Sequence, residues 1–142
     1  MGHVEAALRS ARSQDAARIS ALLEQLGWVV TPEQVVAELS ASPTTELVVA
    51  ESDGDVVGLI AITTRRQFQR AGNLITIDTL VVDEAYRSHG IGGQLVGAAF
   101  EAATRCSAQA VELVSHLRRV DARRFYERLG FEMTSNYFVR TP

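Results

Sequence analysis

The segment Tyr86-Arg87-Ser88-His89-Gly90-Ile91-Gly92-Gly93 stands between an apolar strand pattern and an amphipathic helix pattern. Its glycines let the backbone turn tightly, with N–H groups pointing at one spot. The first turn of the following helix adds unpaired N–H groups and the positive end of the helix dipole. The pattern predicts a seat for a phosphate or pyrophosphate, to which Arg87 can add a charge-assisted hydrogen bond. The alternative is a glycine-rich turn that binds nothing.

Two common phosphate-binding motifs are excluded. All 14 basic side chains of the 142-residue chain are arginines, so the lysine of a P-loop is missing. The same absence excludes a lysine Schiff base. A dinucleotide-binding fingerprint needs a third glycine where this chain has Leu95. What remains is the pattern Arg/Gln-x-x-Gly-x-Gly/Ala, which residues 87–92 match.

The elements around this turn predict an α/β fold. The strand over 74–82 is apolar on both faces, as a central strand is, and its one charged residue is Asp78. A helix runs to about Cys106 and a strand follows over 111–115, which completes a βαβ unit. We also expect strands over 4–8, 46–51, 56–64 and 137–140, a loop or further strand over 65–72, and helices that begin after Ser13, Thr31 and Asp121. Together these elements predict a mixed sheet with flanking helices in a single domain over 1–142.

The composition is that of an ordinary soluble protein. A formal net charge of −3 argues against a dedicated nucleic-acid binder. No apolar run approaches the ~20 residues of a membrane helix, and the first residues do not form a signal peptide. The single cysteine, Cys106, allows neither an internal disulfide nor a cysteine-based zinc site, and we expect no metal. These features favour the cytoplasm.

A second segment gives the turn its context. Asp121-Ala122-Arg123-Arg124-Phe125-Tyr126-Glu127-Arg128-Leu129-Gly130-Phe131 is similar to the "Ala-x-x-Phe-Tyr-x-x-x-Gly-Phe" helix of the GNAT superfamily of N-acetyltransferases. The glycine-rich turn resembles the pyrophosphate-binding motif of that superfamily. Residues 77–82 look like its central strand, and residues 8–11 followed by Asp15 look like its first strand and turn. The resemblance spans nearly the whole chain.

The resemblance implies a GNAT-like acyl-CoA N-acyltransferase fold in which parallel strands over 75–82 and 111–115 splay apart. The pantetheine arm of acetyl-CoA would lie in that gap and pair with the backbone of Leu80 and Val82. The pyrophosphate would lie on amides of residues 88–93. The cofactor-binding residues implied are Leu80, Val81, Val82, Arg87, Ser88, His89, Gly90, Ile91, Gly92, Gly93, Arg119 and Tyr126.

One residue departs from the family pattern. Many relatives carry an asparagine seven residues before the helix tyrosine, where it contacts the cofactor, and this chain has Arg119. The resulting "Arg-x-x-Ala-x-x-Phe-Tyr" looks like a subgroup that includes aminoalkylphosphonate N-acetyltransferases. Part of the cluster Arg118, Arg119, Arg123 and Arg124 would then meet the 3′-phosphate of the cofactor or an anionic substrate, unless it is a solvated helix face.

Acetyl transfer to an amine needs a base, an oxyanion donor and an acid for the leaving thiolate. Tyr126 is the candidate acid, because an unperturbed phenol holds its proton at neutral pH; otherwise it is a core tyrosine. Asp78 is the candidate base, because a buried carboxylate is costly unless it is used or paired; otherwise it pairs with an arginine. His116 is the rival base. We expect the oxyanion donor to be a backbone N–H near Val81, where a strand bulge would place it.

The sequence therefore predicts an acetyl-CoA-dependent N-acetyltransferase that acts on a primary amine of a small molecule by direct attack in a ternary complex. The alternatives are a non-catalytic acyl-CoA-binding module and a protein or peptide acetyltransferase. A homodimer is the oligomeric state considered. Trp28, Phe68 and Tyr137 are candidate walls of the acceptor pocket, and they are equally suited to a core or a dimer interface.

Overall fold

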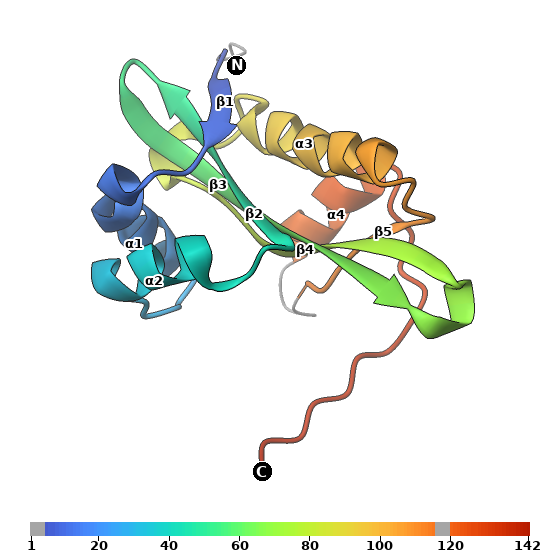
Figure 1. The fold of residues 1–142 in the computed structure, drawn as a ribbon. Coiled ribbons are helices and arrows are strands. Elements are labelled where there is room, and N and C mark those ends of the chain that lie inside the picture. The colour runs from blue at the N-terminus through green and yellow to red at the C-terminus, as the bar shows by residue number, and fades with distance from the viewer. Residues whose placement is uncertain (1–4, 116–119) are drawn as a thin grey trace. The chain divides into compact units, whose positions relative to one another are not determined.

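A computed structural model describes residues 5–115 and 120–142 of the chain (Figure 1). The chain forms two compact units, Met1–Glu112 and Leu113–Pro142. The helices and strands are β1 (Ala7–Ser10), α1 (Ala16–Gln25), α2 (Pro32–Ala41), β2 (Thr45–Ser52), β3 (Asp55–Gln67), β4 (Gly72–Val82), α3 (Ile91–Arg105), β5 (Val111–Leu113) and α4 (Val120–Arg128). In the described ranges no helix is long and apolar enough to cross a membrane.

The strands form one five-stranded sheet in the order β1-β2-β3-β4-β5. The first four strands pair antiparallel with their neighbours. The predicted α/β fold with flanking helices is confirmed. The segment 65–72 continues the strands: β3 and β4 both extend into it and a short 3-10 turn, Phe68–Arg70, joins them. Phe68 at this tip is 99% exposed, so it belongs to no core.

Alternate residues of β3 face two different helix layers. Leu59 lies in a buried cluster with Ile19 and Leu22 of α1 and Val35 of α2. Its neighbour Gly58 faces α3, where a Cβ atom would lie 2.9 Å from Leu95 Cδ1 and 3.4 Å from Ile91 Cγ2. Because successive side chains of a strand point to opposite faces, α1 and α2 cover one face of the sheet and α3 covers the other (Figure 1).

The two predicted helix starts near the N-terminus have different outcomes. The capping box at Thr31 is confirmed: Gln34 N–H donates to Thr31 Oγ1 at 3.2 Å, and Thr31 N–H donates to Gln34 Oε1 at 2.9 Å. The expectation that Ser13 caps α1 is wrong. Ser13 opens a 3-10 turn, and α1 begins at Ala16 with Asp15 in the cap position. Arg9 of β1 holds Asp15 at the end of this 3-10 turn, directly before the helix.

Both terminal strand predictions need correction. The first strand is Ala7–Ser10 rather than 4–8, because pairing with 48–51 of β2 fixes its position. The expected strand over 137–140 is wrong, since residues 131–142 contain no helix or strand. Its apolar side chains are exposed, Tyr137 at 71% and Phe138 at 89%. Strand-favouring residues form a strand only where they pack on a sheet.

The second unit contains α4. Gly130 follows it with φ +92°, as expected for the glycine after a helix. Phe131 N–H donates to the carbonyl of Tyr126 at 3.1 Å and Leu129 N–H donates to the same carbonyl at 3.0 Å, which closes the last turn.

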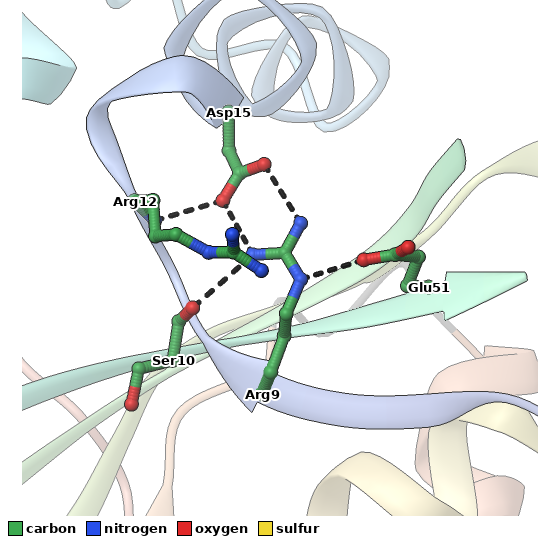
Figure 2. A network of polar contacts seen from close by, with 5 residues as sticks. All are labelled: Arg9, Ser10, Arg12, Asp15 and Glu51. Atoms are coloured by element: carbon green, nitrogen blue, oxygen red, sulfur yellow. Dashed lines mark hydrogen bonds and ion pairs between the residues drawn. The ribbon is translucent and has the colours of Figure 1, made fainter. Parts of the chain in front are cut away.

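A polar network joins β1, β2 and the start of α1 (Figure 2). Arg9 donates to both carboxylate oxygens of Asp15, at 2.8 and 2.9 Å, and to Glu51 Oε2 at 2.6 Å. The N–H of Arg12 adds a 2.8 Å bond to Asp15 Oδ2. Asp15 is 7% exposed, so these bonds replace its hydration. The Arg9 guanidinium lowers the pKa of the Asp15 carboxyl, and Asp15 raises the pKa of Arg9.

We predict that Asp15→Asn lowers the free energy of unfolding at neutral pH by about 2 kcal/mol, because it breaks charged hydrogen bonds. The pKa of Asp15 is lower in the folded state than the unfolded value of about 3.9, so this stabilisation is complete above about pH 5 and is lost as the pH falls through the folded value. Urea unfolding at several pH values should show the difference from wild type shrinking in acid.

Glu46→Gln is the matched control for this experiment. Glu46 forms an ion pair with Arg105 at 2.9 Å, but the two side chains are 51% and 59% exposed. We expect a change of below about 1 kcal/mol. A loss for Asp15→Asn that is equally small, or that does not shrink as the pH falls, would contradict the role given to this network.

Candidate functional site

The glycine-rich turn for which we predict a phosphate seat lies at the start of α3. Gly90 occupies the cap position with φ +86°, a left-handed conformation that favours glycine. Within residues 5–115 and 120–142, no side-chain hydrogen bond caps this end of the 15-residue helix. Ile91 in the first turn is 1% exposed and fixes the helix end in the core. The N–H groups of the first turn, which include those of Gly92 and Gly93, lack intrahelical acceptors and suit an anion.

Arg87 lies between this seat and β4. Its Nε donates to the carbonyl oxygen of Val82 at 3.2 Å, and the side chain is otherwise exposed. Ser88 adopts φ +66°, which turns the chain toward Gly90. His89 is half-buried. Residues 83–90, which include a 3-10 turn over Glu84–Tyr86, therefore link the end of β4 to the start of α3.

The turn begins at Asp83, a residue that the sequence interpretation passed over. Asp83 is 9% exposed and its Oδ1 accepts the N–H of Ala85 at 3.0 Å. Arg18 Nη2 donates to Asp83 Oδ2. The N–H of Ala85 and then the guanidinium of Arg18 lower the pKa of the Asp83 carboxyl. Two acidic residues before a glycine-rich turn are a weak signal, and the partner Arg18 is far away in the chain.

The strand β4 carries a bulge, and it lies at Asp78. Thr79 pairs with Ala61 and Ile77 pairs with Ile62, so Asp78 is an extra residue without a partner on β3. The expectation of a bulge around Val81 is wrong, since Val81 pairs regularly with Leu59. Bulges redirect side chains next to active sites.

Asp78 is exposed, which corrects the expectation of a buried carboxylate. The extra residue breaks the alternation of the strand, so the side chain does not enter the core. Thr63 Oγ1 donates to Asp78 Oδ2 at 2.5 Å, and Thr63 Oγ1 lies 3.0 Å from Thr45 Oγ1. The donor to Asp78 among the described residues is thus a threonine, not the arginine considered as an alternative.

Further polar side chains adjoin this carboxylate, and the sequence interpretation did not select them. Thr76 pairs with Thr63 across the strands, and its Oγ1 donates to Glu112 Oε1 at 3.0 Å. Arg65 Nη2 also donates to Glu112 Oε1 at 3.0 Å. The available signal was that Thr63 and Arg65 stand two residues apart in β3 and therefore on one face of the strand. These residues and Asp78 form a polar surface on the sheet.

Tyr126 lies in α4 of the second unit. It is half-buried and packs edge-to-face with Phe125, at a ring-centroid distance of 5.2 Å, and with Phe131, at 5.8 Å. Arg123 pairs with Glu127 at 3.2 Å, which supports the solvated-face interpretation for Arg123. His116, Arg118 and Arg119 lie outside the described residues.

Comparison with known proteins now gives the class. Residues 15–131 match the family described as "Acetyltransferase (GNAT) family". The chain belongs to the GNAT acetyltransferase family, and it is an N-acetyltransferase. The resemblance found in the sequence is confirmed.

Individual relatives agree with this assignment. The chain is 30% identical over 138 residues to the aminoalkylphosphonate N-acetyltransferase of Salmonella typhimurium strain LT2, covering 94% of this chain and 89% of that protein. Among solved structures, a transcriptional regulator from Bacillus halodurans C-125 matches with TM-score 0.86 and 25% identity, over 96% of this chain and 99% of that chain. A ribosomal-protein-alanine N-acetyltransferase from Brucella melitensis biovar Abortus 2308 matches with TM-score 0.82 and 20% identity, over 96% and 100%. The last likeness bears on the fold alone.

Proposed function

We propose that this enzyme transfers the acetyl group of acetyl-CoA to the primary amine of a small molecule. The observation that carries the proposal is the start of α3, where no described side chain caps the helix. It follows β4 after a short turn, and β4 itself carries the bulge at Asp78. The first feature suits the cofactor and the second suits the reaction.

The cofactor fits the donors present. The family uses acetyl-CoA, whose pyrophosphate needs several N–H donors, and the first turn of α3 offers them together with the positive end of the helix dipole. Arg87 belongs to the turn and is exposed, and its guanidinium would exchange its bond to Val82 for one to a phosphate oxygen. Residues 88–93 would hold the pyrophosphate, and Arg119 and Tyr126 stay predicted contacts.

The pantetheine arm would follow the second half of β4. Gln109 N–H donates to the carbonyl of Asn73, and Ile75 N–H donates to the carbonyl of Ala110, both at 3.0 Å. These bonds join β4 to the chain before β5 at the start of β4. The proposal uses the other end, where the backbone of Leu80 and Val82 would pair with the arm.

In the proposed reaction the amine nitrogen attacks the thioester carbon, the C–S bond breaks and CoA leaves as a thiol. Asp78 takes the proton of the amine, directly or through water, and Thr63 orients its carboxylate. Tyr126 gives a proton to the sulfur. A bulge leaves backbone groups outside the ladder, so a backbone N–H near Asp78 replaces that of Val81 as our oxyanion donor. His116 stays the rival base.

The amine acceptor is proposed to be a small molecule with an anionic group. The support is the 30% identity to an aminoalkylphosphonate N-acetyltransferase, together with the Arg119 pattern shared with that subgroup. The cytoplasmic location and a homodimer stay predictions.

We predict that acetyl-CoA raises the melting temperature, because a ligand that binds only the folded state stabilises it. Thiol release should then identify the acceptor in a screen of aminoalkylphosphonates, amino acids, polyamines, aminoglycosides and peptides. The chain has no lysine, so an acetyl group found on an amine reports either a true acceptor or the N-terminus of the chain. Binding without turnover would favour the non-catalytic module, and turnover with peptides alone would favour a protein acetyltransferase. No thermal shift at a large excess of acetyl-CoA would remove the cofactor assignment.

We predict that Tyr126→Phe lowers kcat by about 10²-fold, the usual contribution of a general acid, while the affinity for acetyl-CoA changes little. Phenylalanine keeps the ring contacts with Phe125 and Phe131, so the fold is retained. Steady-state kinetics and a thermal melt measure both effects. An unchanged kcat across the pH range would exclude the acid role.

We predict that Asp78→Asn lowers kcat/KM for the amine by about 10²-fold near neutral pH, because the side chain no longer accepts a proton. Asparagine still accepts the Thr63 hydrogen bond, and the site is exposed, so stability should change little. Glu46→Gln, another exposed carboxylate, is the control and should keep wild-type rates. Equal kcat/KM in both variants would shift the base role to His116.

A further inference from the structure

The residue directly after β4, Asp83, is fixed by four separate hydrogen bonds. Asp83 N–H donates to the carbonyl of Val57 at 2.8 Å, and the carbonyl of Asp83 accepts Tyr86 N–H at 2.8 Å. Its two carboxylate oxygens accept from Ala85 N–H and from Arg18. Every polar group of this buried residue is thereby satisfied, and the start of the phosphate turn has one defined position.

The helix α1 supplies the side chains that reach this point. Arg18 Nε donates to the carbonyl of Val56 at 2.8 Å while its Nη2 donates to Asp83, so the guanidinium bridges the ends of β3 and β4. Gln25 Oε1 accepts the N–H of Glu84 at 3.0 Å. Gln25 follows Arg18 by two helical turns, so both residues lie on one stripe of α1.

A different stripe of the same helix is locked in the core. Ile19 and Leu22 are 2% and 0% exposed and pack with Leu59 and Val81 of the sheet. The helix is therefore a rigid platform, and its polar stripe fixes the first two residues after β4. The amide seat at Gly90–Gly93 begins a few residues further along the chain.

We propose that Arg18 and Gln25 are positioning residues for the cofactor: through Asp83 and Glu84, α1 sets the place of the turn that receives the pyrophosphate. This inference rests on the proposed function. It adds two residues that lie outside both the glycine-rich turn at 86–93 and the segment at 121–131. Without the two bonds, the amides of the turn would have to be ordered when the cofactor binds, and that ordering weakens the affinity.

The test compares two co-substrates. Acetyl-CoA contains the pyrophosphate, whereas S-acetylpantetheine carries the same thioester without it. We expect Arg18→Gln to raise KM for acetyl-CoA about tenfold, the effect of losing a charged hydrogen bond, with kcat within about twofold. The kcat/KM for S-acetylpantetheine should stay as in wild type. A general loss of structure would lower the rate with both co-substrates.

Three further variants keep the outcome decisive. Gln25→Ala changes an exposed side chain, so the variant is expected to fold, and it should raise KM for acetyl-CoA about threefold. Arg9→Gln breaks the network around Asp15, which contains no residue of the turn, and should lower stability without changing KM. Arg18→Lys keeps the charge and should recover part of the affinity.

The possible failures are distinguishable. A wild-type enzyme that releases no thiol from acetyl-CoA contradicts the proposed function itself. An active wild type in which Arg18→Gln and Gln25→Ala keep the KM for acetyl-CoA, or lose both co-substrates equally, overturns the positioning role alone.

Discussion

The close approach of α3 to β3 at Gly58 is the constraint on which the site depends. A methyl group there would lie 2.9 Å from Leu95 and 3.3 Å from the carbonyl oxygen of Val81. The helix α3 can pack this closely against β3 only because β3 has no side chain at the contact. Its first turn is thereby held beside the end of β4. The hydrophobic core fixes the helix end of the amide seat, while the contacts of α1 with Asp83 and Glu84 fix the start of the turn.

Polar contacts of α1 and of the residue directly before it extend this logic. Two buried aspartates are each held by an arginine and a backbone N–H: Asp15 by Arg9, and Asp83 by Arg18. The first pair joins the start of α1 to β1 and β2, and the second joins α1 to the residue directly after β4. A buried carboxylate with all its partners in place specifies geometry, and removing one partner is costly. The helix α1 is therefore held in place by two sets of contacts, one with the strands β1 and β2 and one with the turn that precedes α3.

The features that were predicted correctly from the sequence depend on residues close together in the chain. The turn at 86–93, the capping box at Thr31 and the glycine after α4 each depend on neighbouring residues and backbone preferences, and they were found. What it missed was set by distant partners. The bulge at Asp78 exists only relative to β3, and Asp83 is explained only by an arginine 65 residues away. The strand predicted over 137–140 failed for the same reason, since propensity alone names no pairing partner.

The bulge also changes the parity of β4. Thr76 pairs with Thr63 and Thr79 pairs with Ala61, so even-numbered residues face the α1 side before the bulge and odd-numbered residues face it afterwards. Both flanks keep full pairing, and a strand one residue shorter would form an uninterrupted ladder with the same core. The sheet therefore has no need of the additional residue. Asp78 interrupts a regular strand at the point where we place the chemistry, as expected where local regularity yields to function.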